Sequence, residues 1–161
     1  MRLTTKTNLA ARVLMFCAVH KDETVRSADI AAMCNASGNH LAQVVHQLHL
    51  HGYVSTQRGR AGGLKLARDM QDISIGKLFR IFESNVPFAE CFSQETNTCP
   101  LIYSCRLRHH IAQALESFYH ALDTVTLADL VHDNCGLEAV LSLTPPTVDD
   151  CHRPKNPPDI S

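Results

Sequence analysis

The chain has 161 residues, 45% of them hydrophobic, and a formal net charge of −1. This is enough apolar material for the core of one domain with an appendage. No apolar run approaches the roughly 18–20 residues that a membrane span needs, and polar residues interrupt the N-terminal segment where a signal peptide would be apolar. These totals argue against a membrane or exported protein and predict a cytoplasmic one.

The small net charge hides an asymmetry along the chain. Residues 1–80 contain eleven Lys or Arg and five Asp or Glu, which gives +6, whereas residues 81–161 contain four and eleven, which gives −7. A basic first half favours a polyanionic partner at that end of the molecule. Chance segregation of solvated charges would produce the same totals, so the local patterns have to decide.

The first half of the chain has the pattern of a helix-turn-helix. We expect a helix over about 7–20, a short second helix with Ser27 as its N-cap, and a third helix that ends at Gly52. The apolar side chains of the third helix form one stripe, and its opposite face carries Asn39, His40, Gln43, His46 and Gln47. Amide and imidazole groups can hydrogen-bond base edges in the major groove of DNA, although a solvated polar face would look the same.

A glycine-rich hairpin follows directly. Two short strands are expected over 54–58 and 64–66, with the sequence GRAGG between them. The glycines permit the positive φ angles of a hairpin tip, and Arg58 and Arg60 at that tip suit contact with phosphates or a minor groove. A hairpin of this kind after a helix-turn-helix predicts a winged-helix DNA-binding domain over 1–84.

The second half predicts a cysteine-bearing loop over 85–104 and then a long helix that begins at Cys105. The apolar positions of this helix follow a heptad pattern: Leu107, Ile111, Ala114, Phe118, Ala121 and Val125. Dimerisation is the expected role, and an ordinary core helix is the alternative. Two short helices complete the segment 105–143, and the Pro- and Asp-rich tail 144–161 is expected to be disordered. The predicted fold class is mainly α with a small β-hairpin wing.

Three of the seven cysteines, Cys91, Cys99 and Cys105, fall within fifteen residues. Their C-x7-C-x5-C spacing lacks the close CxxC pairing of zinc ribbons and thioredoxin-like sites. Three interpretations stay open at this point: zinc with His109 or His110 as a fourth ligand, an iron–sulfur cluster, or free thiols. A redox enzyme could also use a cluster, but no catalytic acid–base pair stands out, so we predict that the protein is not an enzyme. Cys17 and Cys34 lie in helical segments and are expected to be buried.

Four segments in this order, MRLTTKTNLAARVLMF, GYVSTQRGRAGGLKLAR, the cysteine loop and TLADLV, resemble the Rrf2 family of transcription regulators over residues 1 to about 143. The resemblance implies a winged-helix homodimer that holds an iron–sulfur cluster through Cys91, Cys99 and Cys105. It also implies DNA contacts by the wing residues Arg58 and Arg60 and by residues around the third helix: Ser37, Asn39, His40 and Gln43.

Within the family, the chain is most similar to the repressors that respond to nitric oxide, with iron-responsive regulators second. The resemblance implies a [4Fe–4S] cluster, with [2Fe–2S] as the alternative, and a repressor that leaves a palindromic operator when nitric oxide attacks the cluster. Two positions depart from the family pattern. Arg108 stands where some members have a histidine ligand, and Asn8 stands where some have an aspartate that reaches the partner's cluster. Asn8 is therefore expected to be at most a weak fourth ligand. A structural zinc protein that binds DNA is the remaining alternative.

Overall fold

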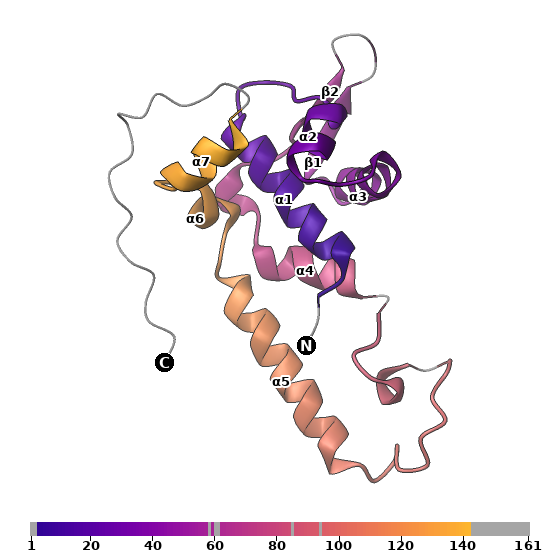
Figure 1. Ribbon diagram of the computed structural model, residues 1–161. Helices are drawn as coiled ribbons and strands as arrows, with labels where there is room; N and C mark the ends of the chain where they lie inside the picture. Colours follow the sequence, from indigo (N-terminus) through magenta and orange to yellow (C-terminus); the bar gives the residue numbers. More distant parts are fainter. Residues whose placement is uncertain (1–2, 58, 60–61, 85, 94, 143–161) are drawn as a thin grey trace.

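The computed structural model describes residues 3–142 except 58, 60–61, 85 and 94. The chain forms helices, one two-stranded antiparallel hairpin and two short 3-10 turns (Figure 1). This mainly helical architecture with a small hairpin confirms the predicted fold class. In chain order the elements are α1 (Thr5–Val19), α2 (Ser27–Met33), α3 (Gly38–Leu50), β1 (Val54–Gln57), β2 (Gly63–Leu66), η1 (Met70–Asp72), α4 (Ile75–Glu83), η2 (Glu90–Phe92), α5 (Arg106–Asp123), α6 (Leu127–Val131) and α7 (Cys135–Leu141).

Side-chain caps set where the helices of the first half begin. The Thr4 hydroxyl accepts a hydrogen bond from the Thr7 amide, so α1 begins two residues earlier than expected. Ser37 caps α3 in the same way by accepting from the His40 amide at 3.3 Å. The expected Ser27 cap is wrong, because Ser27 is the first residue of α2 and Arg26, which makes no side-chain capping bond, precedes it.

The hairpin packs against the segment before α2. Val54 lies opposite Leu66 and Thr56 opposite Leu64 in the antiparallel register. Val25 and Leu64 exchange two backbone hydrogen bonds of 2.9 and 2.8 Å, which adds a third short strand-like contact to the sheet edge. A Cβ on Gly63 would lie 2.9 Å from the Thr24 methyl, so only glycine lets β2 approach this closely. The hairpin therefore has a fixed position relative to α2 and α3.

Helix α1 is the centre of the hydrophobic core. Its Val13, Leu14 and Phe16 are fully buried, and the same cluster contains residues from both ends of the chain. Leu127 and Leu141, on α6 and α7, belong to it, so the chain returns from α5 to pack against its own first half. The segment boundaries expected from the sequence, at 84, 104 and 143, stay a prediction.

Helices α4 and α5 pack most closely where the first turn of α4 meets the end of α5. A Cβ on Gly76 would lie 2.5 Å from the Asp123 amide nitrogen and 2.7 Å from the Tyr119 carbonyl oxygen, so the first turn of α4 touches the backbone of α5. Next to this contact, Arg80 pairs with Glu116 at 2.8 Å and with Asp123 at 3.0 Å. The first half of α5 extends beyond α4 to the lower end of the molecule in Figure 1.

No helix in the described part of the chain is both long enough and apolar enough to cross a membrane.

Candidate functional site: the α3 face and the cysteine loop

The start of α3 presents the polar side chains that the sequence singles out for DNA. Ser37, Asn39, His40 and Gln43 are all exposed, whereas Leu41, Val44 and Leu48 on the opposite face are buried. Burial of the apolar stripe therefore aims the polar face outward, as a recognition helix requires. Arg58 and Arg60, expected at the wing tip, lie outside the described residues, so their DNA contacts stay a prediction.

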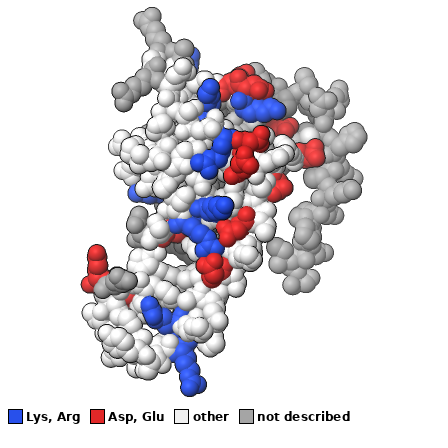
Figure 2. All heavy atoms as spheres, turned by 180° about the vertical axis from the view of Figure 1, so that it is seen from behind, with Lys and Arg blue, Asp and Glu red and all other residues white. Residues whose placement is uncertain are grey.

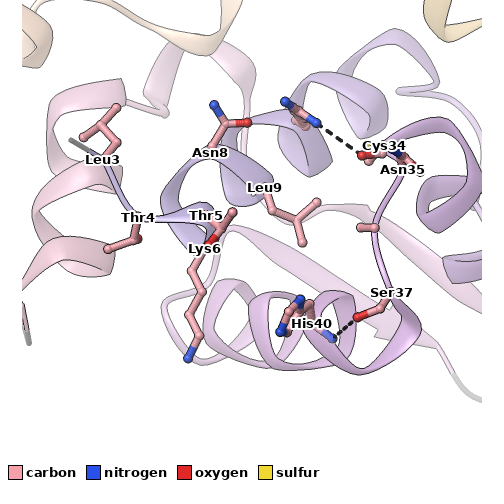
Figure 3. Close-up of a pocket in the computed structure, with 12 residues that line it drawn as sticks. Leu3, Thr4, Thr5, Lys6, Asn8, Leu9, Cys34, Asn35, Ser37 and His40 are labelled. Atoms are coloured by element: carbon pink, nitrogen blue, oxygen red, sulfur yellow. Dashed lines mark hydrogen bonds between the residues drawn. The ribbon is translucent and has the colours of Figure 1, made fainter.

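A cavity of about 690 Å³ separates the start of α1 from the turn before α3 (Figure 3). Asn8 and Lys6 point away from α1 in different directions, and His40 borders the cavity on the α3 side. Arg12 donates to the Cys34 carbonyl at 3.2 Å and so fixes the end of α2 to α1. Sequence patterns did not indicate that Lys6 lies near the recognition helix, because this proximity depends on how α1 crosses α3.

The cysteine loop lies at the opposite end of the molecule from the hairpin (Figure 1). Cys91, Cys99 and Cys105 are free thiols and partly exposed. Cys91 lies in η2, and Cys105 is the N-cap of α5, where its sulfur accepts from the Arg108 amide at 3.4 Å. The Cys99 amide donates to Asn97 Oδ1 at 3.2 Å. Of the three sulfurs, within the part of the chain that the structure describes, that of Cys105 accepts a hydrogen bond from its own helix, and Cys99 is held through its backbone amide.

The three thiols border two adjoining cavities. One, of about 510 Å³, is lined by Cys91 and Cys99, and the other, of about 460 Å³, by Cys105. Both share four lining residues: Phe92, Ile102, Tyr103 and Arg108. Among the described residues, no three His, Cys, Asp or Glu side chains are gathered closely enough to hold a metal ion. The fold thus brings the cysteines to one region without assembling them into a ligand set.

Two contacts close the loop between the cysteines. Glu90 Oε1 accepts hydrogen bonds of 2.6 Å from both the amide and the hydroxyl of Thr98. These bonds lower the pKa of Glu90 and join the neighbours of Cys91 and Cys99. Arg108 Nε donates to the Cys91 carbonyl at 2.9 Å and so joins the start of the loop to α5. We call these two contacts the Glu90–Thr98 clasp and the Arg108–Cys91 clasp.

The start of α5 is rich in basic residues. Its first turns carry Arg106, Arg108, His109 and His110, and the first turn contains no acidic residue. A helix N-terminus already has a partial positive charge, and acidic residues normally offset it. Figure 2 shows basic side chains at the lower end of the molecule, where α5 begins. This end of the molecule therefore favours an anionic group beside Cys105.

A third set of hydrogen bonds ties the segment before the loop to α1. The Glu83 carboxylate, at the end of α4, accepts from the Thr4 amide at 2.8 Å, from the Thr4 hydroxyl at 3.0 Å and from the buried Thr7 hydroxyl. The start of α1, which carries Asn8, is thereby fixed to the element that leads into the cysteine loop.

Comparison with known proteins identifies the family. The family model Rrf2, described as "Iron-dependent Transcriptional regulator", matches residues 3–133. The chain belongs to the Rrf2 family. The HTH-type transcriptional regulator NsrR of Geobacillus kaustophilus is 42% identical over 142 residues, which cover 88% of this chain and 97% of that protein. The NsrR of Bacillus subtilis is 37% identical over 144 residues, with 89% and 99% covered.

Solved Rrf2-type structures have the same fold. The structure of T. potens IscR matches with a TM-score of 0.65 and 27% identity, and covers 83% of this chain and 88% of that one. CymR of B. subtilis, at 24% identity and a TM-score of 0.63, covers 81% and 96% and shows the fold alone. The relatives are transcription regulators, which confirms the prediction that the chain is a winged-helix regulator and not an enzyme.

The sequence did not indicate the two clasps. Position 108 stood out only because it lacks the histidine ligand found in some Rrf2 members. The sequence did contain one usable signal for the Arg108–Cys91 clasp. Arg108 follows Cys105, the N-cap of α5, by three residues, and residues three apart lie on the same face of a helix. The Glu90–Thr98 clasp depends on the path of an irregular loop, and no periodic pattern encodes such a path.

Proposed function

We propose that this Rrf2 protein is an NsrR-type repressor that acts in the cytoplasm as a homodimer, binds a palindromic operator and responds to nitric oxide. Its iron–sulfur cluster, [4Fe–4S] in preference to [2Fe–2S], would be held by Cys91, Cys99 and Cys105. The observation that carries the proposal is the placement of three free thiols around adjoining cavities at the cationic start of α5. The NsrR relatives, 42% identical in the first case, support the same choice.

The chemistry of the donor set fits such a cluster. Thiolates are the soft ligands that iron–sulfur clusters require, and three of them make an anionic site that the charges of Arg106 and Arg108 at the start of α5 would stabilise. The loop has to close further to bring the sulfurs together, because they are not gathered in the present arrangement. A fourth ligand from the partner subunit would have to come from Asn8, whose amide binds iron more weakly than a carboxylate.

The long helix supports a dimer. No residue of α5 is buried within one chain, and Leu107 at the start of its heptad pattern is 66% exposed. Ile111 and Phe118, further along the same stripe, are only partly covered. A second α5 packed along this stripe would bury it. Two α3 helices would then be available for half-sites about one DNA turn apart.

The chain's own contacts suggest how the loop controls DNA binding. When bound, the cluster supplies iron that reacts with nitric oxide. Cys105 caps α5, whose other end is fixed to α4 by Arg80, and α4 is fixed to α1 by Glu83. A change at Cys105 therefore reaches both helices that support the DNA-binding half. A difference of about 3–5 kcal/mol between two dimer arrangements is enough to release most operators.

The decisive experiment is anaerobic. The protein is purified from iron-replete cells, its visible absorbance is recorded, and nitric oxide is added while binding to its own promoter DNA is followed. We expect a coloured cluster and loss of DNA binding after a few equivalents of nitric oxide. A cluster indifferent to nitric oxide but lost with DNA binding under an iron chelator would indicate an iron-responsive regulator instead. A colourless zinc protein would contradict the proposal.

The variant Cys99→Ala should lose the cluster and fail to repress its target genes, since two thiolates cannot replace three. Cys135→Ala, which removes a half-buried thiol outside the loop, is the matched control and should keep the cluster. Normal repression by Cys99→Ala would contradict the sensing mechanism.

A further inference from the structure

Arg108 occupies a position that connects every part of the cysteine site. Its amide donates to the Cys105 sulfur at 3.4 Å, and its guanidinium Nε donates to the Cys91 carbonyl at 2.9 Å. The guanidinium carbon lies 5.5 Å from the centre of the ring of Phe92, the residue that follows Cys91 in the sequence. One residue of α5 therefore holds both the first and the last cysteine segment.

The guanidinium also has unused hydrogen-bonding capacity. Within the described part of the chain, Arg108 forms no ion pair, and Nε is its only guanidinium atom with a hydrogen bond. Arg108 lines both cavities, the one with Cys91 and Cys99 and the one with Cys105. Its remaining N–H donors can therefore reach an acceptor that lies between the three thiols. Thiolate and sulfide sulfurs are acceptors of this kind.

We propose that Arg108 is a positioning residue for the cluster: it holds the Cys91 and Cys105 segments within reach of one cluster and donates hydrogen bonds to its sulfurs. This inference rests on the proposed function, because it requires that a cluster is bound. The role differs from that of an iron ligand, since a guanidinium has no lone pair to offer a metal. Some Rrf2 members have a histidine ligand at the position of Arg108. In this chain the same position would therefore have a different role.

The proposal requires arginine specifically. The planar guanidinium can donate to a carbonyl, stack on an aromatic ring and donate to a third acceptor at the same time. Lysine keeps the charge but cannot satisfy all three partners, so Arg108→Lys should restore part of what Arg108→Ala loses. Arg106→Ala is the control for charge, because Arg106 is an exposed arginine of the same turn that lines the Cys105 cavity, and its side chain forms no hydrogen bond in the described residues. It removes one positive charge from this end of α5 and leaves the hydrogen bonds of Arg108 in place.

The test compares the full-length wild type, Arg108→Ala, Arg108→Lys and Arg106→Ala after anaerobic reconstitution with iron and sulfide. Three quantities are measured: iron and sulfide content, the rate of cluster loss to an iron chelator, and the reduction potential. Residues that orient metal ligands typically change metal affinity about 10- to 100-fold. We expect at least about tenfold faster loss from Arg108→Ala than from wild type or Arg106→Ala, with Arg108→Lys in between.

The potential separates this role from a merely structural one. Hydrogen bonds and positive charge near the sulfurs favour the reduced cluster, so Arg108→Ala, which loses both, should have a lower reduction potential than wild type and than Arg106→Ala, which loses the charge alone. Melting of the metal-free proteins checks that the variants are folded. Equal loss rates and potentials in Arg108→Ala and Arg106→Ala would overturn the inference. A wild type that binds no cluster would instead overturn the proposed function itself.

Discussion

Individual cysteines of this chain sit in two kinds of environment. Cys17, in α1, and Cys34, at the end of α2, are buried in the core, whereas the three loop cysteines are partly exposed. Burial, with a smaller contribution from nearby Cys34, raises the pKa of Cys17 to about 12. Burial also raises the pKa of Cys34, although Arg12 acts in the opposite direction. Since the thiolate is the reactive form, the two core thiols should be inert while the loop thiols are available.

This difference can be measured on the reduced, metal-free protein. Brief treatment with iodoacetamide at about pH 8 should alkylate Cys91, Cys99 and Cys105, and leave Cys17 and Cys34 unmodified until urea is added. Mass spectrometry of the digested protein gives the extent of modification at each site. Early modification of Cys17 in the folded protein would show that the helix-turn-helix core opens more readily than its packing indicates.

At the level of elements, local signals predicted most of the helices and the hairpin. The Leu41, Val44 and Leu48 stripe of α3 and the glycines of the hairpin depend on residues close in the sequence, so they are readable without a structure. Contacts between distant segments were not readable: the Glu83 ties, the two clasps and the packing of α6 on α1. For the candidate site, the sequence supplied the cysteines, and the family resemblance supplied their role.

The contact between α4 and α5 provides a test at this scale. Gly76→Ala would force a Cβ into the Asp123 and Tyr119 backbone. Separating the two helices should cost roughly 1–3 kcal/mol, as overpacking usually does. Thermal melting is the measurement, with Gly136→Ala in α7 as the control, because its Cβ would meet nothing closer than 3.8 Å. An unchanged melting temperature in Gly76→Ala would mean that α5 is not held against α4 at this point.

In the whole molecule, the charge asymmetry of the sequence is partly resolved by folding. Arg80, from the basic half, pairs with Glu116 and Asp123 from the acidic half. The hydrogen bonds from Arg80 lower the pKa of Glu116. Figure 2 shows basic and acidic side chains next to one another over much of the visible face. The net charges of +6 and −7 are therefore a property of the two halves of the sequence. They do not correspond to two oppositely charged surfaces on the face shown in Figure 2.

The core also joins the two halves, which leads to a prediction for the whole molecule. Leu127 of α6 is fully buried in the cluster around α1. Leu127→Ala should cost about 2–5 kcal/mol and reduce DNA binding, although residue 127 is far from α3 in the sequence. Val140→Ala, at a position 67% exposed on α7, is the control and should change little. Urea unfolding and DNA affinity measure both effects. Wild-type stability in Leu127→Ala would indicate that the DNA-binding half folds without α6.

The return of α6 and α7 to α1 also means that the cysteine loop is not what keeps the two parts of the chain together. A protease that cuts once within residues 95–104 would leave one fragment with α1 to α4 and another with α5 to α7. The two fragments share the core around Val13 and Leu127 and the Arg80 pairs. They should elute together in gel filtration, and fragments expressed separately should reassemble. The loop is thus a segment that can be cut, lengthened or exchanged while the framework around it persists.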